Sequence, residues 1–317
     1  MKVASMFAGI GGICLGFKQA GFEVAWANDI DADAIKTYTR NHKSVLALEG
    51  DIRKISTDII PSFDILTAGF PCQSFSVRGK QLGFKDPRGN LFFEIGRVIN
   101  AKRPRVILLE NVANLMSHDD GKTFLVIYNT LAGFGYFVKY AILDAATHGN
   151  IPQKRERIFI AAFLDETDCL RFNFPKPVEQ AVCLNDIIKR DIKHSDCYYY
   201  TDNSYYYQDL LITVTDKNCL YLITDYGVSK KKYPIASTLK ANMGTFADRV
   251  PVLLDDYGIR KLTPRECLDL QGFTSEFEFG QGISLNAAYK QAGNTVCVPV
   301  IKRIAEQIKL ACCDNKL

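Results

Sequence analysis

The sequence lacks several features that would assign it to a simple class of protein. Its ten cysteines include no Cys-x-x-Cys pair, so we expect no zinc ribbon, thioredoxin motif or other metal site. No apolar run approaches the roughly 18 residues of a membrane-spanning helix. The 39 basic and 35 acidic side chains leave a net charge of +4, which is too small to identify a polyanion as partner and too positive to exclude one.

The N-terminus offers a secreted protein as an alternative. Met1 and Lys2 precede an apolar run to Phe17, and small residues at 25 and 27 resemble a cleavage site. Glycines interrupt that run, however, and the cysteines lack the spacing of a disulfide framework. The sequence therefore predicts a cytoplasmic protein with reduced, mostly buried thiols.

The composition is that of a globular protein with a sizeable core. Of the 317 residues, 47% are hydrophobic and 23% are charged, and the length predicts about two domains. In the first half, short apolar runs alternate with helical patterns, which predicts an α/β fold with a mostly parallel, doubly wound sheet. Gly21 and Gly133 are expected to be left-handed caps after two of the helices. The expected strands are 3–7, 24–27, 45–48, 64–68 and 106–109, and the expected helices are 13–20, 32–41, 91–101 and 124–131.

Two further strands, 137–143 and 157–163, have no clear helix between them, so we expect an antiparallel addition at one edge of the sheet. Residues 186–258 lose the alternation, and they predict a smaller, irregular, partly β domain. Helical periodicity returns at 263–270 and 299–310. We therefore divide the chain into a catalytic domain, 1–185 with 286–317, and a second domain with its hinge, 186–285.

A glycine-rich turn follows the first strand. Gly9, Gly11 and Gly12 let the backbone bend sharply and approach a ligand closely. Asp29 ends the next strand about 20 residues later, a spacing that suits a carboxylate bound to a ribose hydroxyl. The pattern departs from G-x-G-x-x-G, so a simple strand–helix turn stays open as an alternative. Asp51, after the third strand, is either a further ligand contact or a helix cap.

Cys72 follows the fourth strand in a turn restrained by Pro71. Ligands bind outside the carboxyl ends of strands in open α/β sheets, so this thiol is placed to be a nucleophile rather than an inert buried cysteine. The basic, glycine-punctuated loop up to residue 90 suggests a mobile lid over a polyanion. Glu110 ends the fifth strand at the same edge. Gln153, Arg155 and Arg157 alternate on one face of an extended segment, where they bind either an anion or surface carboxylates.

These residues together resemble one family, the DNA (cytosine-5)-methyltransferases of bacterial restriction–modification systems. Six segments match that family's motif series in its order, and the resemblance covers nearly the whole chain apart from residues 178–258. They are FAGIGG from residue 7, PCQ from 71, ENV from 110, QKRER from 153, RKLTPREC from 260 and GNTVCVPV from 293.

The resemblance implies a domain that binds S-adenosyl-L-methionine, with S-adenosyl-L-homocysteine as the product, and a smaller target-recognition domain. Asp29 would bind the ribose, Ile30 would cover the adenine, and Asn294 with Thr295 would hold the methionine end. The family commonly has Glu, a larger apolar residue and Gly where this chain has Asp29, Ile30 and Asn150, and Asn tolerates the left-handed backbone that Gly would adopt. The implied cofactor-binding residues are Phe7, Gly9, Gly11, Asp29, Ile30, Asp51, Ile52, Gly69, Pro71, Leu91, Asn294 and Thr295.

The resemblance also implies the chemistry. The Cys72 thiolate would add to C6 of a cytosine flipped out of duplex DNA, so that C5 can accept the methyl group. Glu110 would bind the N3/N4 edge, Arg155 would hold O2, and Arg157 would support the catalytic loop. The implied DNA-binding residues are Gln73, Ser76, Arg78, Lys80, Lys230, Lys231, Thr238 and Arg249.

The implied partner is double-stranded DNA, and the protein is expected to be a monomer near the nucleoid that protects DNA from a cognate restriction endonuclease. Three alternatives are an RNA cytosine-5 methyltransferase, a catalytically silent DNA-binding protein and a nicotinamide-dependent oxidoreductase. The large variable region argues against the first of them, and intact Cys72, Glu110 and Arg155 argue against the second.

Overall fold

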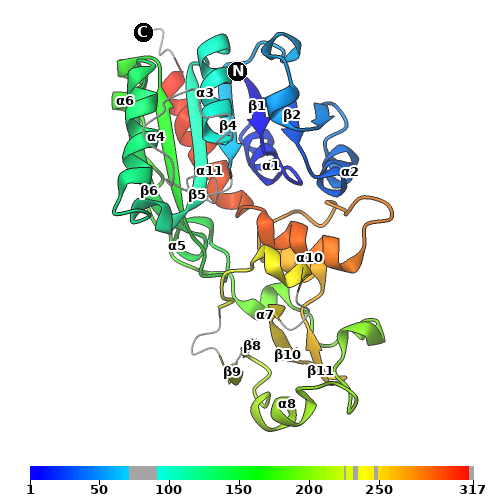
Figure 1. The fold of residues 1–317 in the computed structure, drawn as a ribbon. Coiled ribbons are helices and arrows are strands. Elements are labelled where there is room, and N and C mark those ends of the chain that lie inside the picture. The colour runs from blue at the N-terminus through cyan, green and yellow to red at the C-terminus, as the bar shows by residue number, and fades with distance from the viewer. Residues whose placement is uncertain (71–90, 225, 231–234, 246–248, 314–317) are drawn as a thin grey trace. The chain divides into compact units, whose positions relative to one another are not determined.

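The computed structural model describes residues 1–70, 91–224, 226–230, 235–245 and 249–313 (Figure 1). Two compact units divide the chain. Unit 1 comprises residues 1–143, 156–176 and 300–317, and unit 2 comprises residues 144–155 and 177–299. Three segments that we expected in the catalytic domain, residues 144–155, 177–185 and 286–299, thus belong to the second compact unit. The expected division of the chain by function, with cofactor binding in 1–185 and 286–317, stays a prediction.

Unit 1 is built on a sheet of seven described strands in the order β3-β2-β1-β4-β5-β7-β6. The pairs β1–β2, β1–β4, β2–β3 and β4–β5 are parallel, and β5–β7 is antiparallel. The predicted mostly parallel α/β sheet with an antiparallel addition is therefore confirmed. The strands are β1 (Lys2–Met6), β2 (Glu23–Asp29), β3 (Leu46–Glu49), β4 (Ile65–Gly69), β5 (Val106–Val112), β6 (Phe137–Asp144) and β7 (Glu156–Phe163).

Helices pack on both faces of this sheet (Figure 1). On one face, α3 and α4 bury Phe92 and Ile127 against alternating strand residues such as Leu66 and Leu109. On the other face α1 crosses α11 so closely that a Cβ on Gly16 would lie 2.6 Å from the Ile301 side chain. The helices are α1 (Gly12–Gln19), α2 (Ala32–Asn41), α3 (Leu91–Lys102), α4 (Lys122–Gly133), α6 (Glu166–Arg171) and α11 (Val298–Cys312), with short 3-10 turns η1 (Ile52–Lys54), η2 (Thr57–Ile59) and η5 (Ala113–Met116).

The two predicted glycine caps have different outcomes. Gly21 has φ 83°, so the left-handed cap after α1 is confirmed. The prediction for Gly133 is wrong, because α4 includes that residue and Gly135 adopts the left-handed conformation instead, with φ 84°. A second glycine only two residues further on gives the helix an alternative end, which the sequence pattern does not distinguish.

Unit 2 contains a smaller sheet of four described strands in the order β11-β10-β8-β9, with antiparallel pairs throughout. Its core is small and includes Leu210, Tyr221, Val252 and Ile259. The predicted irregular, partly β region is thus confirmed. The elements are α5 (Ala145–Gly149), α7 (Leu184–Ile187), η6 (Asp196–Tyr198), α8 (Tyr207–Thr213), β8 (Tyr221–Thr224), β9 (Gly227–Lys230), η7 (Ala241–Gly244), β10 (Val252–Leu254), β11 (Ile259–Lys261), α9 (Pro264–Asp269) and α10 (Leu285–Asn294).

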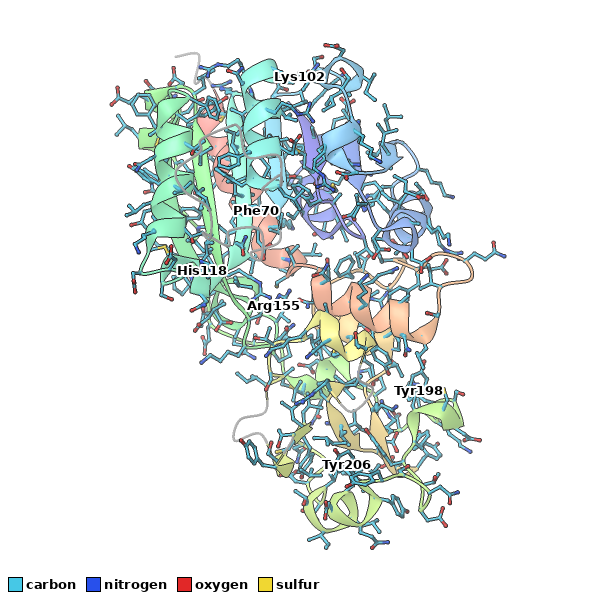
Figure 2. The ribbon with its side chains drawn as sticks, viewed as in Figure 1. Phe70, Lys102, His118, Arg155, Tyr198 and Tyr206 are labelled. Atoms are coloured by element: carbon cyan, nitrogen blue, oxygen red, sulfur yellow. The ribbon has the colours of Figure 1, made fainter. Side chains whose placement is uncertain are left out.

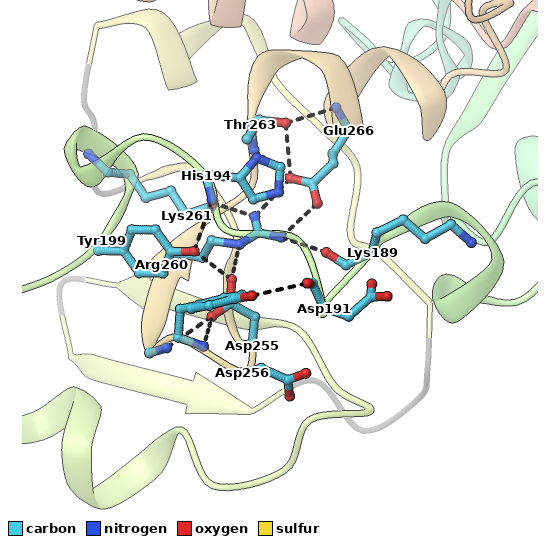
Figure 3. A network of polar contacts seen from close by, with 12 residues as sticks. Lys189, Asp191, His194, Tyr199, Asp255, Asp256, Arg260, Lys261, Thr263 and Glu266 are labelled. Atoms are coloured by element: carbon cyan, nitrogen blue, oxygen red, sulfur yellow. Dashed lines mark hydrogen bonds and ion pairs between the residues drawn. The ribbon is translucent and has the colours of Figure 1, made fainter.

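A buried ionic network around Arg260 joins the segments of unit 2 (Figure 3). The guanidinium donates to Asp255 at 2.6 Å and to both carboxylate oxygens of Glu266 at 2.8 Å, and it is fully buried. Glu266 in turn accepts the backbone N–H of Thr263, which completes a capping box at the start of α9. Tyr199 donates its hydroxyl to Asp255 at 2.9 Å. The buried carboxylates of Asp255 and Glu266 thus depend on one cation, Arg260, for their charge pairing.

The described cysteines are free thiols, and five of the nine are buried. No helix among the described residues has the length and apolar character to cross a membrane.

Candidate functional site

The glycine turn after β1 has an unusual backbone in unit 1. Phe7, Gly9 and Gly11 have φ values of 54°, 55° and 90°. Positive φ is ordinary for glycine but strained for a bulky aromatic residue such as Phe7, and strain of this kind gathers at functional sites. The N–H of Gly11 donates to the Ala8 carbonyl at 2.9 Å and closes the turn.

Gly9 and Gly11 are needed for opposite reasons. A Cβ on Gly11 would lie 2.3 Å from Nε2 of His42 and 2.9 Å from the Tyr38 ring, so these two side chains pack tightly against the turn. Burial lowers the pKa of His42 to about 3, which keeps this supporting ring neutral. A Cβ on Gly9 would meet nothing within 4 Å. The turn is therefore supported at Gly11 and leaves open space at Gly9, as a ligand cradle requires.

Asp29, at the end of β2, holds this turn. One carboxylate oxygen accepts the N–H of Gly9 at 2.7 Å, and the other accepts the N–H of Asp31 at 2.9 Å. Burial raises the pKa of Asp29 above its ordinary value, and the backbone hydrogen bonds partly oppose that shift. A carboxylate has about four acceptor positions, so Asp29 retains acceptor capacity for ligand hydroxyls. Beside it, the apolar side chain of Ile30 is 66% exposed.

Asp51 caps the 3-10 turn η1, as one of its two predicted roles. Its carboxylate accepts the N–H of Arg53 and pairs with the guanidinium of Arg53, which lowers the pKa of Asp51 to about 2. Ile52 is buried, and its carbonyl accepts a hydrogen bond from Arg97 on α3 at 2.8 Å. These contacts fix the position of residues 51 and 52 near the end of β3. The other role expected for Asp51, a contact with the ligand, stays a prediction.

A second group of side chains lies where β4 and β5 end. Gly69 is opposite Glu110 in the parallel register, and a Cβ at Gly69 would lie 3.3 Å from Oε2 of Glu110. Glu110 pairs with Arg157, with 3.1 Å between Oε1 and Nε, and both side chains are mostly buried. The strand-end carboxylate predicted from sequence thus has a cation on the antiparallel strand β7.

Asn111 was not assigned a role from sequence, yet it holds the end of β4. Its side chain is buried and donates to the carbonyl of Phe70 at 2.9 Å (Phe70 is labelled in Figure 2). Phe70 directly precedes the segment that carries the predicted nucleophile. That segment lies outside the described residues, and with it Pro71, Cys72, Gln73, Ser76, Arg78 and Lys80; Leu91 is the first residue of α3 and is partly buried.

In unit 2, Arg155 is buried with 3% exposure (Figure 2). Its guanidinium donates to the carbonyls of Leu239 at 2.7 Å, Gly293 at 3.4 Å and Thr295. Arg155 thus binds main-chain oxygens, whereas Arg157 is the arginine that pairs with Glu110. Sequence alternation placed both arginines on one face and did not distinguish their partners.

The other predicted residues of unit 2 have varied surroundings. Thr238 donates its hydroxyl to the carbonyl of Lys154 at 2.7 Å. Asn294 is exposed at the end of α10, and Thr295 is buried in extended backbone beyond it. Arg249 is partly buried, Lys230 pairs through its backbone with Tyr221, and Lys231 lies outside the described residues. Among the described residues, no group of three or more His, Cys, Asp or Glu side chains could hold a metal ion.

Comparison with known proteins identifies the family. Residues 1–310 match the family model for C-5 cytosine-specific DNA methylase. The chain is 47% identical over 97% of its length to the type II methyltransferase M.Bsp6I of Bacillus sp. (strain RFL6), covering 98% of that protein. It is 40% identical over 98% of its length to the type II methyltransferase M.NlaX of Neisseria lactamica, covering 96% of that protein.

A solved structure confirms the fold. A variant of the methyltransferase DNMT2 of Spodoptera frugiperda superposes with a TM-score of 0.75 over 97% of this chain and 99% of its own, at 20% identity. The predicted methyltransferase fold and family resemblance are both confirmed. The chain belongs to the C-5 cytosine-specific DNA methylases, and it is an enzyme that transfers a methyl group to C5 of cytosine in DNA.

Proposed function

We propose that this enzyme methylates one cytosine within a specific duplex DNA sequence, with S-adenosyl-L-methionine as methyl donor. The observation that carries the proposal is the shared edge of the unit 1 sheet. The glycine turn follows β1, Asp29 ends β2, and the Glu110–Arg157 pair lies where β5 ends. Parallel strands bring these carboxyl ends to one side of the sheet, where open α/β folds bind their ligands.

The residues fit the proposed cofactor, which supplies an electrophilic methyl group when bound. The open space beside Gly9 would face the nucleoside, and the acceptor capacity that Asp29 keeps beside its backbone hydrogen bonds would serve the ribose. The exposed apolar side chain of Ile30 gains cover by packing on adenine. We assign the remaining cofactor contacts to Phe7, Gly11, Asp51, Ile52, Gly69, Pro71, Leu91, Asn294 and Thr295. Of these, Asn294 and Thr295 would hold the methionine end.

The chain's own residues account for the activation of cytosine. The Cys72 thiolate forms a bond to C6, and the electron pair of the C5–C6 double bond moves to C5, while Glu110 binds the N3/N4 edge. C5 would then form its bond to the methyl carbon of S-adenosyl-L-methionine as the methyl–sulfur bond breaks, with its electron pair going to sulfur, so that S-adenosyl-L-homocysteine is the leaving group. The C5 proton leaves to solvent water, and the C6–sulfur bond breaks to restore the double bond and the thiolate. The base must leave the stack for this attack, so we infer base flipping.

We assign the cytosine O2 contact to Arg157 rather than Arg155. Arg157 is paired with Glu110 on the neighbouring strand, so one ring could meet both side chains. The guanidinium of Arg155 is already committed to three carbonyl oxygens. Exchanging Arg157 for Lys should therefore lower kcat, since a point charge cannot keep the geometry of a guanidinium fork.

The target sequence is proposed to be recognised by residues 186–285. Lys230, Lys231, Thr238 and Arg249 would contact DNA there, and Gln73, Ser76, Arg78 and Lys80 would do so from the catalytic loop. The relatives' type II names support a pairing with a restriction endonuclease. We further propose a cytoplasmic monomer that acts near the nucleoid.

The test is tritiated methyl transfer from S-adenosyl-L-methionine to duplex DNA and, in parallel, to tRNA. We expect transfer to the duplex only, at one sequence that bisulfite sequencing of a plasmid from expressing cells identifies. Replacing residues 186–258 with the equivalent region of a relative that methylates another sequence should switch the methylated sequence. Transfer to tRNA alone would overturn the DNA substrate, and an unchanged sequence after the exchange would move recognition to the loop at 77–90.

A further inference from the structure

Arg155 connects two segments of unit 2 that are far apart in the sequence. One is residues 236–245, here called the target segment, which contains Thr238 of the predicted DNA-binding set. The other is residues 293–295, the GNT segment, to which the proposed function assigns the methionine end of the cofactor. The guanidinium donates to Leu239 in the first segment and to Gly293 and Thr295 in the second.

The first part of the target segment, residues 236–239, is held against residues 152–155. The N–H of Ala236 donates to the Pro152 carbonyl at 2.7 Å, and the N–H of Lys154 donates to the Ala236 carbonyl at 2.8 Å. Gln153, fully buried, accepts the N–H of Leu239 at 3.1 Å and donates to the Leu270 carbonyl at 2.6 Å. These contacts set the register of residues 236–239 against residues 152–155.

The target segment also packs on α10, which ends in the GNT segment. A Cβ on Gly293 would lie 2.2 Å from the carbonyl carbon and oxygen of Lys240. A Cβ on Gly244 would lie 2.3 Å from the Asn286 carbonyl oxygen, close to the other end of the same helix. Backbones this close cannot shift independently, since interiors are packed to crystal-like density.

We propose that Arg155 is a positioning residue that couples cofactor binding to target recognition. This inference rests on the proposed function, which places the cofactor's methionine end at Asn294 and Thr295. A guanidinium is a rigid planar fork, so carbonyls bonded to its two terminal nitrogens keep a fixed relative geometry. A change in the position of the GNT segment when the cofactor binds is therefore transmitted to Leu239, and by linkage cognate DNA strengthens cofactor binding by the same factor as the cofactor strengthens DNA binding.

The experiment measures that factor. The affinity of S-adenosyl-L-homocysteine is determined by calorimetry with and without a duplex that contains the sequence the enzyme methylates. The affinity of that duplex is then determined with and without S-adenosyl-L-homocysteine. We expect both ratios in the wild-type protein to agree and to lie at about 5- to 150-fold. In Arg155→Lys, the ammonium keeps the charge but not the fork, and we expect the ratio to fall close to one.

Gln153→Met is the matched control. It removes a side chain that grips Leu239 and Leu270 but not the GNT segment. We expect it to weaken duplex binding equally with and without S-adenosyl-L-homocysteine, so its ratio stays at the wild-type value. A general loss of packing would instead lower the ratio in both variants and would overturn the role of Arg155.

Gly293→Ala is a second probe, should Arg155→Lys fail to fold. Its methyl group forces the Lys240 backbone away from α10, so the ratio should again fall. A wild-type ratio near one, or a full ratio in Arg155→Lys or in Gly293→Ala, overturns the proposal. Failure of the proposed function looks different, because the wild-type protein would then bind no S-adenosyl-L-homocysteine or methylate no duplex.

Discussion

The glycine turn of unit 1 and the target segment of unit 2 are both precise backbone structures, but they are made in different ways. The turn uses positive φ at Phe7, Gly9 and Gly11. Asp29, on the next strand and 20 residues from Gly9, fixes it through a hydrogen bond. The target segment is fixed by Gln153 and Arg155, which lie 84 to 86 residues from the backbone they hold. The glycine turn is thus a local structure, whereas the target segment is held by residues that are distant in the sequence.

Under the proposed function, this difference separates the chemistry of the enzyme from its specificity. The residues of the turn and of the strand ends would bind the cofactor and the cytosine itself, whatever DNA sequence surrounds that base, and each of them follows directly from a strand of the sheet. The target segment depends on side chains whose partners are set by tertiary packing. Loss of a local residue should therefore remove one function, whereas loss of a long-range contact should disturb a whole region.

The largest expected effect is that of Cys72→Ser. A serine hydroxyl is a far weaker nucleophile than a thiolate, so we expect methyl transfer to fall by more than about a thousandfold. Binding of the target duplex should persist, which gel-shift titration measures. A duplex with 5-fluorocytosine at the target should trap a covalent adduct of the wild-type protein only. Transfer by Cys72→Ser at a near-normal rate would contradict the mechanism.

The next effect is the loss of the buried cation of unit 2. Arg260→Met leaves the carboxylates of Asp255 and Glu266 buried without their partner, which costs about 3–5 kcal/mol. We expect rapid hydrogen exchange in β10 and β11 while the strands of unit 1 stay protected. Lys217→Met is the control, because its ion pair with Asp256 is half exposed and worth at most about 1 kcal/mol. Equal loss of protection in both units would show that unit 2 is not an independent region.

Asp29→Ala should have an intermediate effect confined to the cofactor. Charge-assisted hydrogen bonds contribute about 1.5–3 kcal/mol, so S-adenosyl-L-methionine should bind roughly tenfold more weakly or worse by calorimetry. NAD should not bind measurably to the wild-type protein. Tight NAD binding would support the oxidoreductase alternative for the glycine turn.

The pH dependence of cofactor binding is a second test of the role of Asp29. In the proposed site, ribose hydroxyls donate to the ionised carboxylate of Asp29, so we expect cofactor affinity to be full above the pKa of Asp29 and to fall as the pH drops through it. Burial raises that pKa, so the fall should begin at higher pH than for an ordinary aspartate. Asp51 stays ionised over that range, because Arg53 lowers its pKa to about 2. Asp29→Asn should remove this dependence, and an unchanged profile would assign it to another group.

The smallest expected effect is at Asn150. This residue has φ 53°, so the left-handed turn expected there is confirmed, and its side-chain oxygen accepts the N–H groups of Ala181 and Val182 at 2.8 and 3.1 Å. Asn150→Gly should cost about 1 kcal/mol for the lost hydrogen bonds, whereas Asn150→Ala should cost more because alanine also disfavours positive φ. Thermal unfolding measures both, and a more stable Asn150→Ala would contradict this account.

Much of unit 1 was predictable, since strand–helix alternation and strand-end residues are local patterns. The sheet, the glycine turn and the positions of Asp29 and Glu110 follow from them. The helix α5 was not predicted, because five residues are too few to show a helical period. The partners of Arg155, Asn111 and Gln153 were not predictable either, because each partner is a main-chain atom of a segment that only folding brings near.

That last feature bears on how target preference can diverge in evolution. Four of the contacts that hold the target segment end on the amide or carbonyl of Ala236 and Leu239, atoms that nearly every residue type supplies. The side chains of Ala236 and Leu239 are themselves buried, whereas those of Lys240, Asn242 and Thr245 are exposed, so point mutations at these three exposed positions leave the four contacts in place. Under the proposed function, the recognised DNA sequence can therefore change during evolution while the backbone of the target segment is inherited unchanged.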